Sequence, residues 1–336
     1  MLRKTLLITL LIALMTACAP QATPTTAPVA TEIVVISSPP GTEAPATEAV
    51  ETAPVDVTLT LTDGLGREVQ LNEHAQRVVS LAPSITEILF AIGAGSQVVG
   101  RDDLSDFPAE SQSVPSIGAT YGDLNTEAIV ALEPDLVVAA DINTPEQVKS
   151  LEDLGITVYY FKNPTDFEGM YKDLGTMGQL TGHVDEAAAL ADSLSKRVEA
   201  VEAAVANIAE KPTVFYEIDG TDTAKPWTTG PGTFMDTMIT MAGGVNIGGV
   251  LSDQYAQISV EEIVLQNPDI IILGDTLYGV TIESIAGRAG WGDLTAVQEN
   301  KIFSFDDNLA SRPGPRLVDG LEELLKILHP ELVPAS

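Results

Sequence analysis

The chain has 336 residues, enough for a sizeable core, and its single cysteine leaves no disulfide within it. Its 48 acidic residues outnumber 17 basic ones, for a formal charge of −31 at pH 7. This balance disfavours binding to nucleic acid or anionic lipid headgroups, which need clustered Lys and Arg, and it argues against a pocket for a highly anionic ligand.

The first residues have the pattern of a secretory signal. Arg3 and Lys4 precede an apolar run over 5–15, shorter than the roughly 20 residues that span a bilayer, and small residues lead to Cys18. We expect a signal peptide over 1–17 and lipidation of Cys18, which would anchor the protein to a membrane facing the periplasm or cell exterior. The alternative is an uncleaved anchor helix with a bystander cysteine.

A composition change separates a tether from the folded part. Residues 18–55 are mostly Pro, Thr, Ala, Val and Glu, which gain too little from burial to offset the entropy of ordering. We expect a semi-extended, lipid-anchored disordered tether there. The remainder is long enough for two lobes. We predict an N-terminal α/β lobe over 56–183, a linking helix over 184–210 and a C-terminal α/β lobe over 211–336.

Strands alternate with helices along the first lobe. A β-branched run over 77–82 predicts a strand, and the Pro83–Ser84 turn opens a helix. Apolar runs over 136–140 and 156–161 predict further strands. The run over 136–140 lacks alternation between apolar and polar residues, which indicates a strand buried on both faces, as in a parallel sheet.

The stretch 184–210 contains no Gly or Pro and places apolar residues at helical spacing. It predicts a helix of roughly 40 Å. A single long helix between two lobes would restrict hinge motion. The alternative is an ordinary surface helix of one lobe.

The second lobe follows the same order as the first. Residues 213–218 predict a strand, the turn at 230–233 opens a helix to Met241, and the runs over 270–273 and 302–305 predict further strands. Strands alternating with helices in both halves predict two α/β lobes.

An internal repeat relates the two lobes. Segments beginning at Tyr121 and Tyr255 are offset by 134 residues and share a Glu, an Ile-Val pair, a Pro-Asp pair and a final Asp. In each copy Asn125 or Ser259, both residues of N-cap type, opens a short helix, and Pro-Asp ends it before a buried strand. Each lobe is therefore predicted to contain a loop, a helix and a strand in one order.

These residues resemble the helical-backbone class of periplasmic binding proteins for cobalamin and ferric siderophores. The resemblance is carried by residues 62–69, 77–87, 124–137 and 311–316, and it covers 58 to about 329. It implies the class III periplasmic binding protein fold, α/β with two Rossmann-like lobes joined by one long α-helix. It also implies a monomeric, non-enzymatic solute-binding lipoprotein that serves an ABC permease dimer with its ATPase.

The resemblance also implies docking residues. In that family one outward-facing Glu from each lobe pairs with Arg residues of the permease, and Glu127 and Glu261 match those positions. Two rim carboxylates can steer and register such a partner. The alternative for each is an acid in a helix first turn that interacts favourably with the macrodipole.

In that family the ligand occupies a shallow cleft between the lobes. Tyr121, Trp227 and Tyr255 match aromatic cleft positions, Arg312 matches a cleft arginine, and Ser84 is the remaining expected contact. Converging aromatics suit a large, flat, largely uncharged ligand. We therefore rank a cobalt corrinoid such as cobalamin first, then another small-molecule metal chelate, a ferric siderophore, and then haem. Each aromatic could instead be a packing residue.

The sequence disfavours several other ligands and functions. Besides Arg312, the candidate cleft arginines are Arg101 and Arg288. Three arginines are too few for a catecholate siderophore, which carries a high negative charge. The three histidines are far apart in sequence, which disfavours a metal site of the protein's own. No dinucleotide or phosphate-loop pattern is completed. Ser84 lacks a nucleophile elbow, which leaves an exported hydrolase-like enzyme as a distant alternative, with no catalytic residue or cofactor expected.

Overall fold

The computed structural model describes residues 58–333. The expected signal peptide, Cys18 and the tether lie outside the described residues. The chain divides into one unit over Met1–Ala53 and another over Pro54–Ser336, and the second contains every described residue. None of the helices formed within 58–333 combines the length and apolar character needed to cross a membrane.

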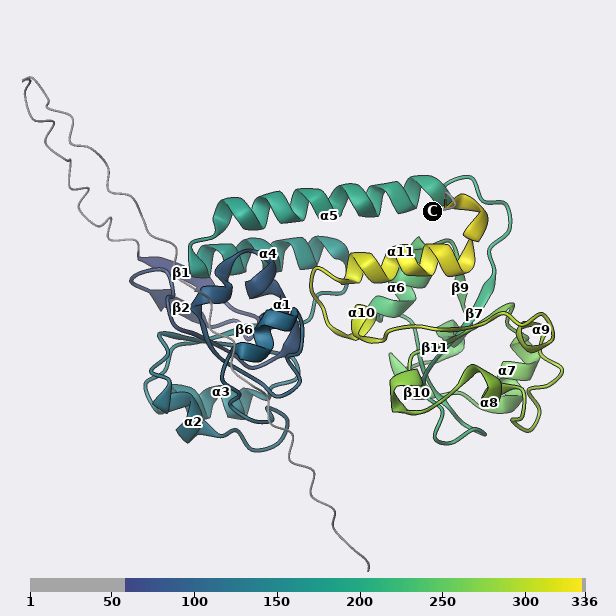
Figure 1. Cartoon of the computed structure of the whole chain (residues 1–336), viewed down its shortest axis with the longest axis horizontal. Helices are drawn as coiled ribbons and strands as arrows, with labels where there is room; N and C mark the ends of the chain where they lie inside the picture. The colour runs from purple at the N-terminus through teal and green to yellow at the C-terminus, as the bar shows by residue number, and fades with distance from the viewer. Residues whose placement is uncertain (1–57, 334–336) are drawn as a thin grey trace, which may run out of the picture. The chain divides into compact units, whose positions relative to one another are not determined.

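A parallel four-stranded sheet forms the first lobe (Figure 1). Its strands, in spatial order, are β4 (Val98–Arg101), β3 (Val78–Ser80), β5 (Leu136–Ala140) and β6 (Val158–Phe161). Every residue of β3 and β5 is buried, as expected for inner strands of a sheet covered on both faces. The helices of this lobe are α1 (Pro83–Ala91), α2 (Thr126–Ala131), α3 (Pro145–Glu152) and α4 (Phe167–Thr181). An antiparallel hairpin, β1 (Leu59–Thr62) with β2 (Glu68–Leu71), precedes them and was not predicted.

The second lobe contains a mixed six-stranded sheet. Its order is β10 (Tyr255–Gln257), β8 (Trp227–Thr229), β7 (Thr213–Asp219), β11 (Ile270–Leu273) and β12 (Ile302–Ser304), with β9 (Val245–Asn246) paired to β7. Strands β7, β11 and β12 are parallel, whereas β8 and β10 are antiparallel. The helices are α6 (Phe234–Met241), α7 (Val260–Gln266), α8 (Ile282–Ile285), α9 (Thr295–Gln298), α10 (Asn308–Ser311) and α11 (Leu317–Leu328). The repeated segment that begins at Tyr255 was predicted to start with a loop, and this was wrong for Tyr255, which begins edge strand β10.

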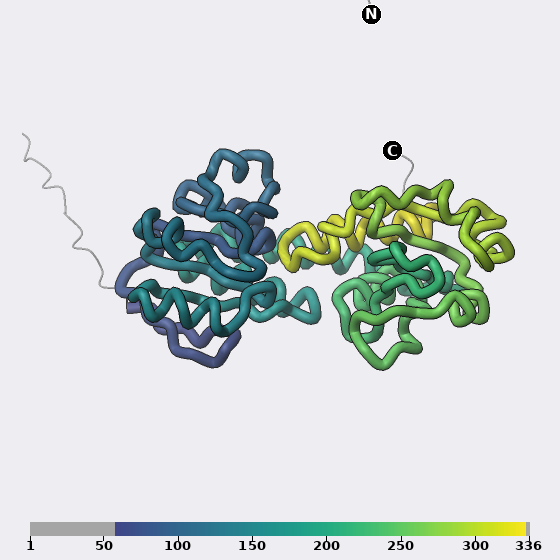
Figure 2. The backbone as a smooth tube through the Cα atoms, turned by 90° about the horizontal axis from the view of Figure 1, so that it is seen from below, coloured from purple at the N-terminus to yellow at the C-terminus, as the bar shows by residue number. Residues whose placement is uncertain are grey.

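Helix α5 (Val184–Val205) packs against α4 of the first lobe and α11 of the second (Figure 1). Figure 2 shows the two lobes side by side from below. Its buried side chains include Leu194, Val198 and Val201. Arg197 donates to Glu322 of α11 at 2.8 Å. The helix ends at Val205 rather than at 210, since Asn207 belongs to a residue type that favours helix ends over interiors.

The repeated motif has a structural explanation in each lobe. The side chain of Asn125 accepts a hydrogen bond from the Ala128 amide, and Ser259 accepts one from the Glu262 amide, so both predicted N-caps are confirmed. The aspartate of each Pro-Asp pair accepts a hydrogen bond from a backbone amide at or just before the start of a neighbouring strand. Asp135 accepts from the Gln76 amide at 2.7 Å, and Asp269 from the Thr213 amide at 2.8 Å. These carboxylates therefore connect a helix end to a strand start.

Candidate ligand-binding cleft

A cavity of about 320 Å³ is lined by both lobes. The first lobe contributes Ala82, Pro83, Ser84, Leu104, Ala140, Ile142 and Asn163, and the second Tyr278, Asn308, Ser311, Arg312 and Pro313. Ala140 ends strand β5, and the Ala82–Ser84 segment follows β3. The cavity thus lies at the carboxyl ends of parallel strands, where α/β sheets usually bind ligands. Two predicted contacts, Ser84 and Arg312, are brought together here.

The three predicted aromatic contacts lie outside this cavity and are all exposed. In the antiparallel pair β8–β10, Tyr255 is opposite Thr229 and Gln257 is opposite Trp227. Because side chains alternate between the faces of a strand, Trp227 and Tyr255 project from the same face of this ribbon. Tyr121 belongs to the other lobe, on the loop before α2.

Sequence analysis missed Tyr278, an aromatic residue of the cavity itself. It ends a short 3-10 turn, Thr276–Tyr278, that follows β11, and it is 86% exposed. The repeat ends at Asp275, so Tyr278 lies beyond it and has no matching position in the first lobe. Its place directly after a buried parallel strand is the signal that could have found it.

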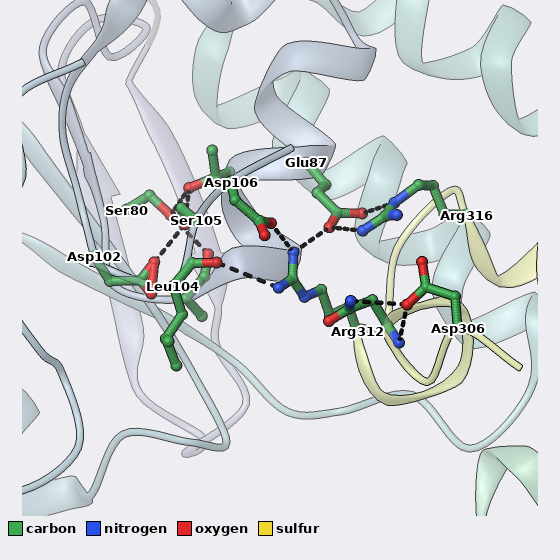
Figure 3. A network of polar contacts seen from close by, with 12 residues as sticks. Ser80, Glu87, Asp102, Leu104, Ser105, Asp106, Asp306, Arg312 and Arg316 are labelled. Atoms are coloured by element: carbon green, nitrogen blue, oxygen red, sulfur yellow. Dashed lines mark hydrogen bonds and ion pairs between the residues drawn. The ribbon is translucent and has the colours of Figure 1, made fainter. Parts of the chain in front are cut away.

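Four charged side chains form an interlobe ion-pair network: Glu87 and Asp106 of the first lobe, and Arg312 and Arg316 of the second (Figure 3). Arg316 donates to both carboxylate oxygens of Glu87, at 2.8 and 2.5 Å. Arg312 donates to Glu87 at 3.2 Å and to Asp106 at 2.5 Å. The arginine expected to contact ligand is therefore held between two carboxylates.

The other two candidate cleft arginines, Arg101 and Arg288, do not line this cavity. Arg101 donates to the carbonyl oxygens of Ser111 and Asp102, both at 2.9 Å. Arg288 forms a buried ion pair with Glu217, with one contact at 2.8 Å, and its guanidinium lies 4.7 Å from the Trp291 ring centroid. Arg312 is thus the one cationic side chain that lines the cavity within residues 58–333.

The expected docking residues occupy equivalent places in the two lobes. Glu127 and Glu261 are exposed in the first turns of α2 and α7. Within the described part of the chain, neither carboxylate accepts a side-chain hydrogen bond or forms an ion pair. Three residues further along each helix lies an exposed valine, Val130 at 45% and Val264 at 44%. Each lobe therefore exposes a glutamate and a valine, three residues apart, on a short helix.

A larger groove, of about 640 Å³, lies on the first lobe alone, between the β1–β2 hairpin, β6 and α4. Asp173 of α4 lines it, together with Lys162 and Lys172. Asp173 also lines a small apolar cavity that includes Ser84 and Phe161. Burial raises the pKa of Asp173 to about 7, and Lys172 opposes the rise. Within residues 58–333, no group of three or more His, Cys, Asp or Glu side chains is arranged to hold a metal ion.

Two α/β lobes, one long helix packed against both and a cavity lined from both sides define the class III periplasmic binding protein fold. The chain belongs to the periplasmic binding protein family, whose profile matches residues 78–309. The resemblance read from the sequence is confirmed.

Known proteins with similar sequence and structure support this assignment. The chain is 31% identical over 280 residues to an uncharacterized ABC transporter substrate-binding lipoprotein of Bacillus subtilis, covering 81% of this chain and 86% of that protein. It is 31% identical over 275 residues to a cobalamin-binding protein of Halobacterium salinarum, covering 80% and 73%. The structure of a periplasmic heme-binding protein from Roseiflexus sp. RS-1 aligns with a TM-score of 0.69 at 26% identity, covering 77% of this chain and all (100%) of that one.

Proposed function

We propose that this chain is the extracytoplasmic solute-binding lipoprotein of an ABC importer, and that it delivers a metal chelate to the permease without changing it chemically. A corrinoid such as cobalamin is the favoured ligand. The main support is a cavity lined by both lobes, accompanied by exposed aromatic side chains on each lobe. A binding protein needs this arrangement for affinity, and it needs no nucleophile or acid–base pair.

The shape and chemistry of the cleft favour a large, largely uncharged ligand. A cavity of about 320 Å³ holds only part of a corrinoid, so the remainder would lie against Tyr121, Trp227 and Tyr255. Asn163, Asn308 and Arg312 offer hydrogen-bond donors that suit the amide groups of a corrin periphery. The cobalamin-binding relative from Halobacterium salinarum supports the same ligand class.

Haem or a ferric siderophore bound in the same cleft is the second candidate. The heme-binding structural relative from Roseiflexus supports haem. An axial ligand to haem iron is commonly His or Tyr, and Tyr121 or Tyr255 could serve. However, within residues 58–333 the cavity lining offers a ligand with several carboxylates one cationic side chain, that of Arg312.

Glu127 and Glu261 would dock the permease. The other acidic positions that both copies share have structural partners. Asp135 and Asp269 cap strand starts, while Asp141 accepts from the Tyr160 hydroxyl at 2.7 Å and Asp275 from the Gly220 amide at 2.7 Å. Of the acidic positions that both copies share, only the two glutamates lack a side-chain hydrogen bond or ion pair within residues 58–333, and each has an exposed valine three residues further along its helix. Paired carboxylates on a rim suit a partner with two arginine clusters.

Lipidation of Cys18 would hold the protein at the membrane. Replacing Cys18 with Ser should yield soluble or uncleaved protein with unchanged ligand affinity, which cell fractionation and a titration of the purified protein can measure. A fully processed Cys18→Ser protein that still fractionates with membranes would rule out the lipid anchor.

The ligand assignment is tested by titrating a soluble form, from residue 56 on, with cobalamin, a ferric hydroxamate and haem. Tryptophan fluorescence reports on the cleft because Trp227 is exposed, whereas Trp291 is fully buried. Trp291→Phe should keep the ligand-dependent quenching, and Trp227→Phe should lose most of it.

Truncating Tyr121, Trp227 or Tyr255 to Ala should each cost roughly 1–3 kcal/mol, about 5- to 150-fold in affinity by calorimetry. The Tyr121/Tyr255 double variant should nearly abolish binding without changing the thermal unfolding midpoint. If no probe binds, or if these substitutions unfold the protein without altering affinity, the proposed site is wrong.

A further inference from the structure

Arg312 is already engaged by three acceptors of the protein. It donates to Glu87 at 3.2 Å, to Asp106 at 2.5 Å and to the Leu104 carbonyl oxygen at 3.3 Å (Figure 3). Arg312 also lines the cavity, so any acceptor on a ligand must share it with these groups.

The two carboxylates differ in how readily they can leave Arg312. The side chain of Glu87 is 1% exposed, and Arg316 already donates to both of its oxygens. The side chain of Asp106 is 59% exposed, and Arg312 is its one ion-pair partner among residues 58–333. A solvated carboxylate loses little by returning to water, whereas a buried one must remain paired. When an acceptor on a ligand competes for Arg312, Asp106 rather than Glu87 is therefore the carboxylate that can give way.

We propose that Asp106 is a specificity-determining residue that disfavours anionic chelates by competing for Arg312. This inference rests on the proposed binding function. Two arginines face two carboxylates in the interlobe ion-pair network, so the group offers no net positive charge. A ligand carboxylate that displaces Asp106 leaves a like charge beside itself, which weakens its binding. A neutral ligand that presents an amide oxygen meets no such repulsion.

The test compares Asp106→Asn with Asp103→Asn in the soluble protein. Asp103 is an exposed carboxylate of the same segment, and it accepts a hydrogen bond from Ser116 rather than from Arg312. The two variants change net charge equally, so only loss of the competition for Arg312 distinguishes them. Circular dichroism and thermal unfolding check that both are folded.

The dissociation constants of cyanocobalamin, haemin and an anionic ferric tris-catecholate are measured at low salt and at about 0.5 M salt. Asp106→Asn should improve binding of the anionic probes relative to cyanocobalamin by about two- to fivefold, the range of an exposed ion pair, and salt should reduce the change. Asp103→Asn should leave the ratio unchanged.

Two failures are distinguishable. If the wild-type protein binds none of the three probes, the proposed ligand class fails, and the role of Asp106 fails with it. If the wild-type protein binds but both variants keep its ratio, or if Asp106→Asn weakens anionic binding, only the role of Asp106 is overturned.

Discussion

Asp173, which lines the first-lobe groove and the small cavity, shows how one carboxyl group can make stability depend on pH. Burial raises its folded-state pKa to about 7, against a value near 4 in an unfolded chain. Between these values the folded protein retains a proton that the unfolded chain releases. The folded state therefore loses relative stability as pH rises from about 4 to 7, and the loss persists above that range.

Replacing Asp173 with Asn should remove this penalty. The variant should be more stable than the wild type at pH 8 by roughly 1–3 kcal/mol, and within about 0.5 kcal/mol of it at pH 4. Urea unfolding at the two pH values measures the difference. Asp192→Asn, an exposed carboxylate on α5, is the control and should show neither change. An equal gain at both pH values would indicate a packing effect instead.

Single residues of the cleft were predictable where a local motif marked them. Ser84 and Arg312 lie in segments that could be compared with a family, and both line the cavity. The interlobe ion-pair network was not predictable, because Glu87 and Arg312 are 225 residues apart in the chain. Local periodicity in the sequence does not indicate such a contact. Tyr278 can likewise be recognised as a cleft residue only from the cavity that it lines.

At the scale of elements, long buried strands and capped helices were predictable, and short edge strands were not. Strand β5 has the predicted bounds, and β11 does also, because a continuous β-branched run followed by polar residues is a strong signal. Strands β8 and β10 have three residues each. Three residues are too few to show a period in the sequence. The ribbon that carries Trp227 and Tyr255 is therefore evident only from the pairing of β8 with β10 in the structure.

Helices α2 and α7 provide a test of docking at this scale. Glu127→Ala and Glu261→Ala should leave ligand affinity unchanged and each reduce transporter-dependent uptake by roughly threefold, and together by more than about tenfold. Under the proposed docking each lobe addresses one half of the permease dimer, so the double variant would lose both contacts. Uptake of labelled ligand in cells with the cognate transporter is the measurement.

Glu146→Ala is the matched control for docking, because Glu146 is also an exposed acid in a helix first turn, that of α3. If the glutamates act only on the helix macrodipole, all three single variants should lose a few tenths of a kcal/mol of stability and none should lose uptake. Normal uptake by the Glu127/Glu261 double variant would therefore reject docking.

At the scale of the whole molecule, two different connections join the lobes. Helix α5 packs against α4 in one lobe and α11 in the other, and Arg197 pairs with both Asp319 and Glu322 of α11. The interlobe ion-pair network adds a second connection through Glu87. The helix was predictable from an uninterrupted apolar period. The second connection was not, although it bears on the same property, the freedom of the lobes to move.

These connections predict a small change in shape on ligand binding. The radius of gyration of the soluble protein, measured by solution scattering, should change by less than about 1 Å with saturating ligand, as in pre-organised complexes. Glu87→Gln is the informative comparison. It preserves the shape of the side chain but removes the charge paired with Arg312 and Arg316, so a larger ligand-dependent change should follow. Thermal unfolding checks that this variant is folded under the conditions used. A decrease of more than about 2 Å in the wild type would mean that α5 does not restrain the lobes, and that closure of the cleft is part of binding.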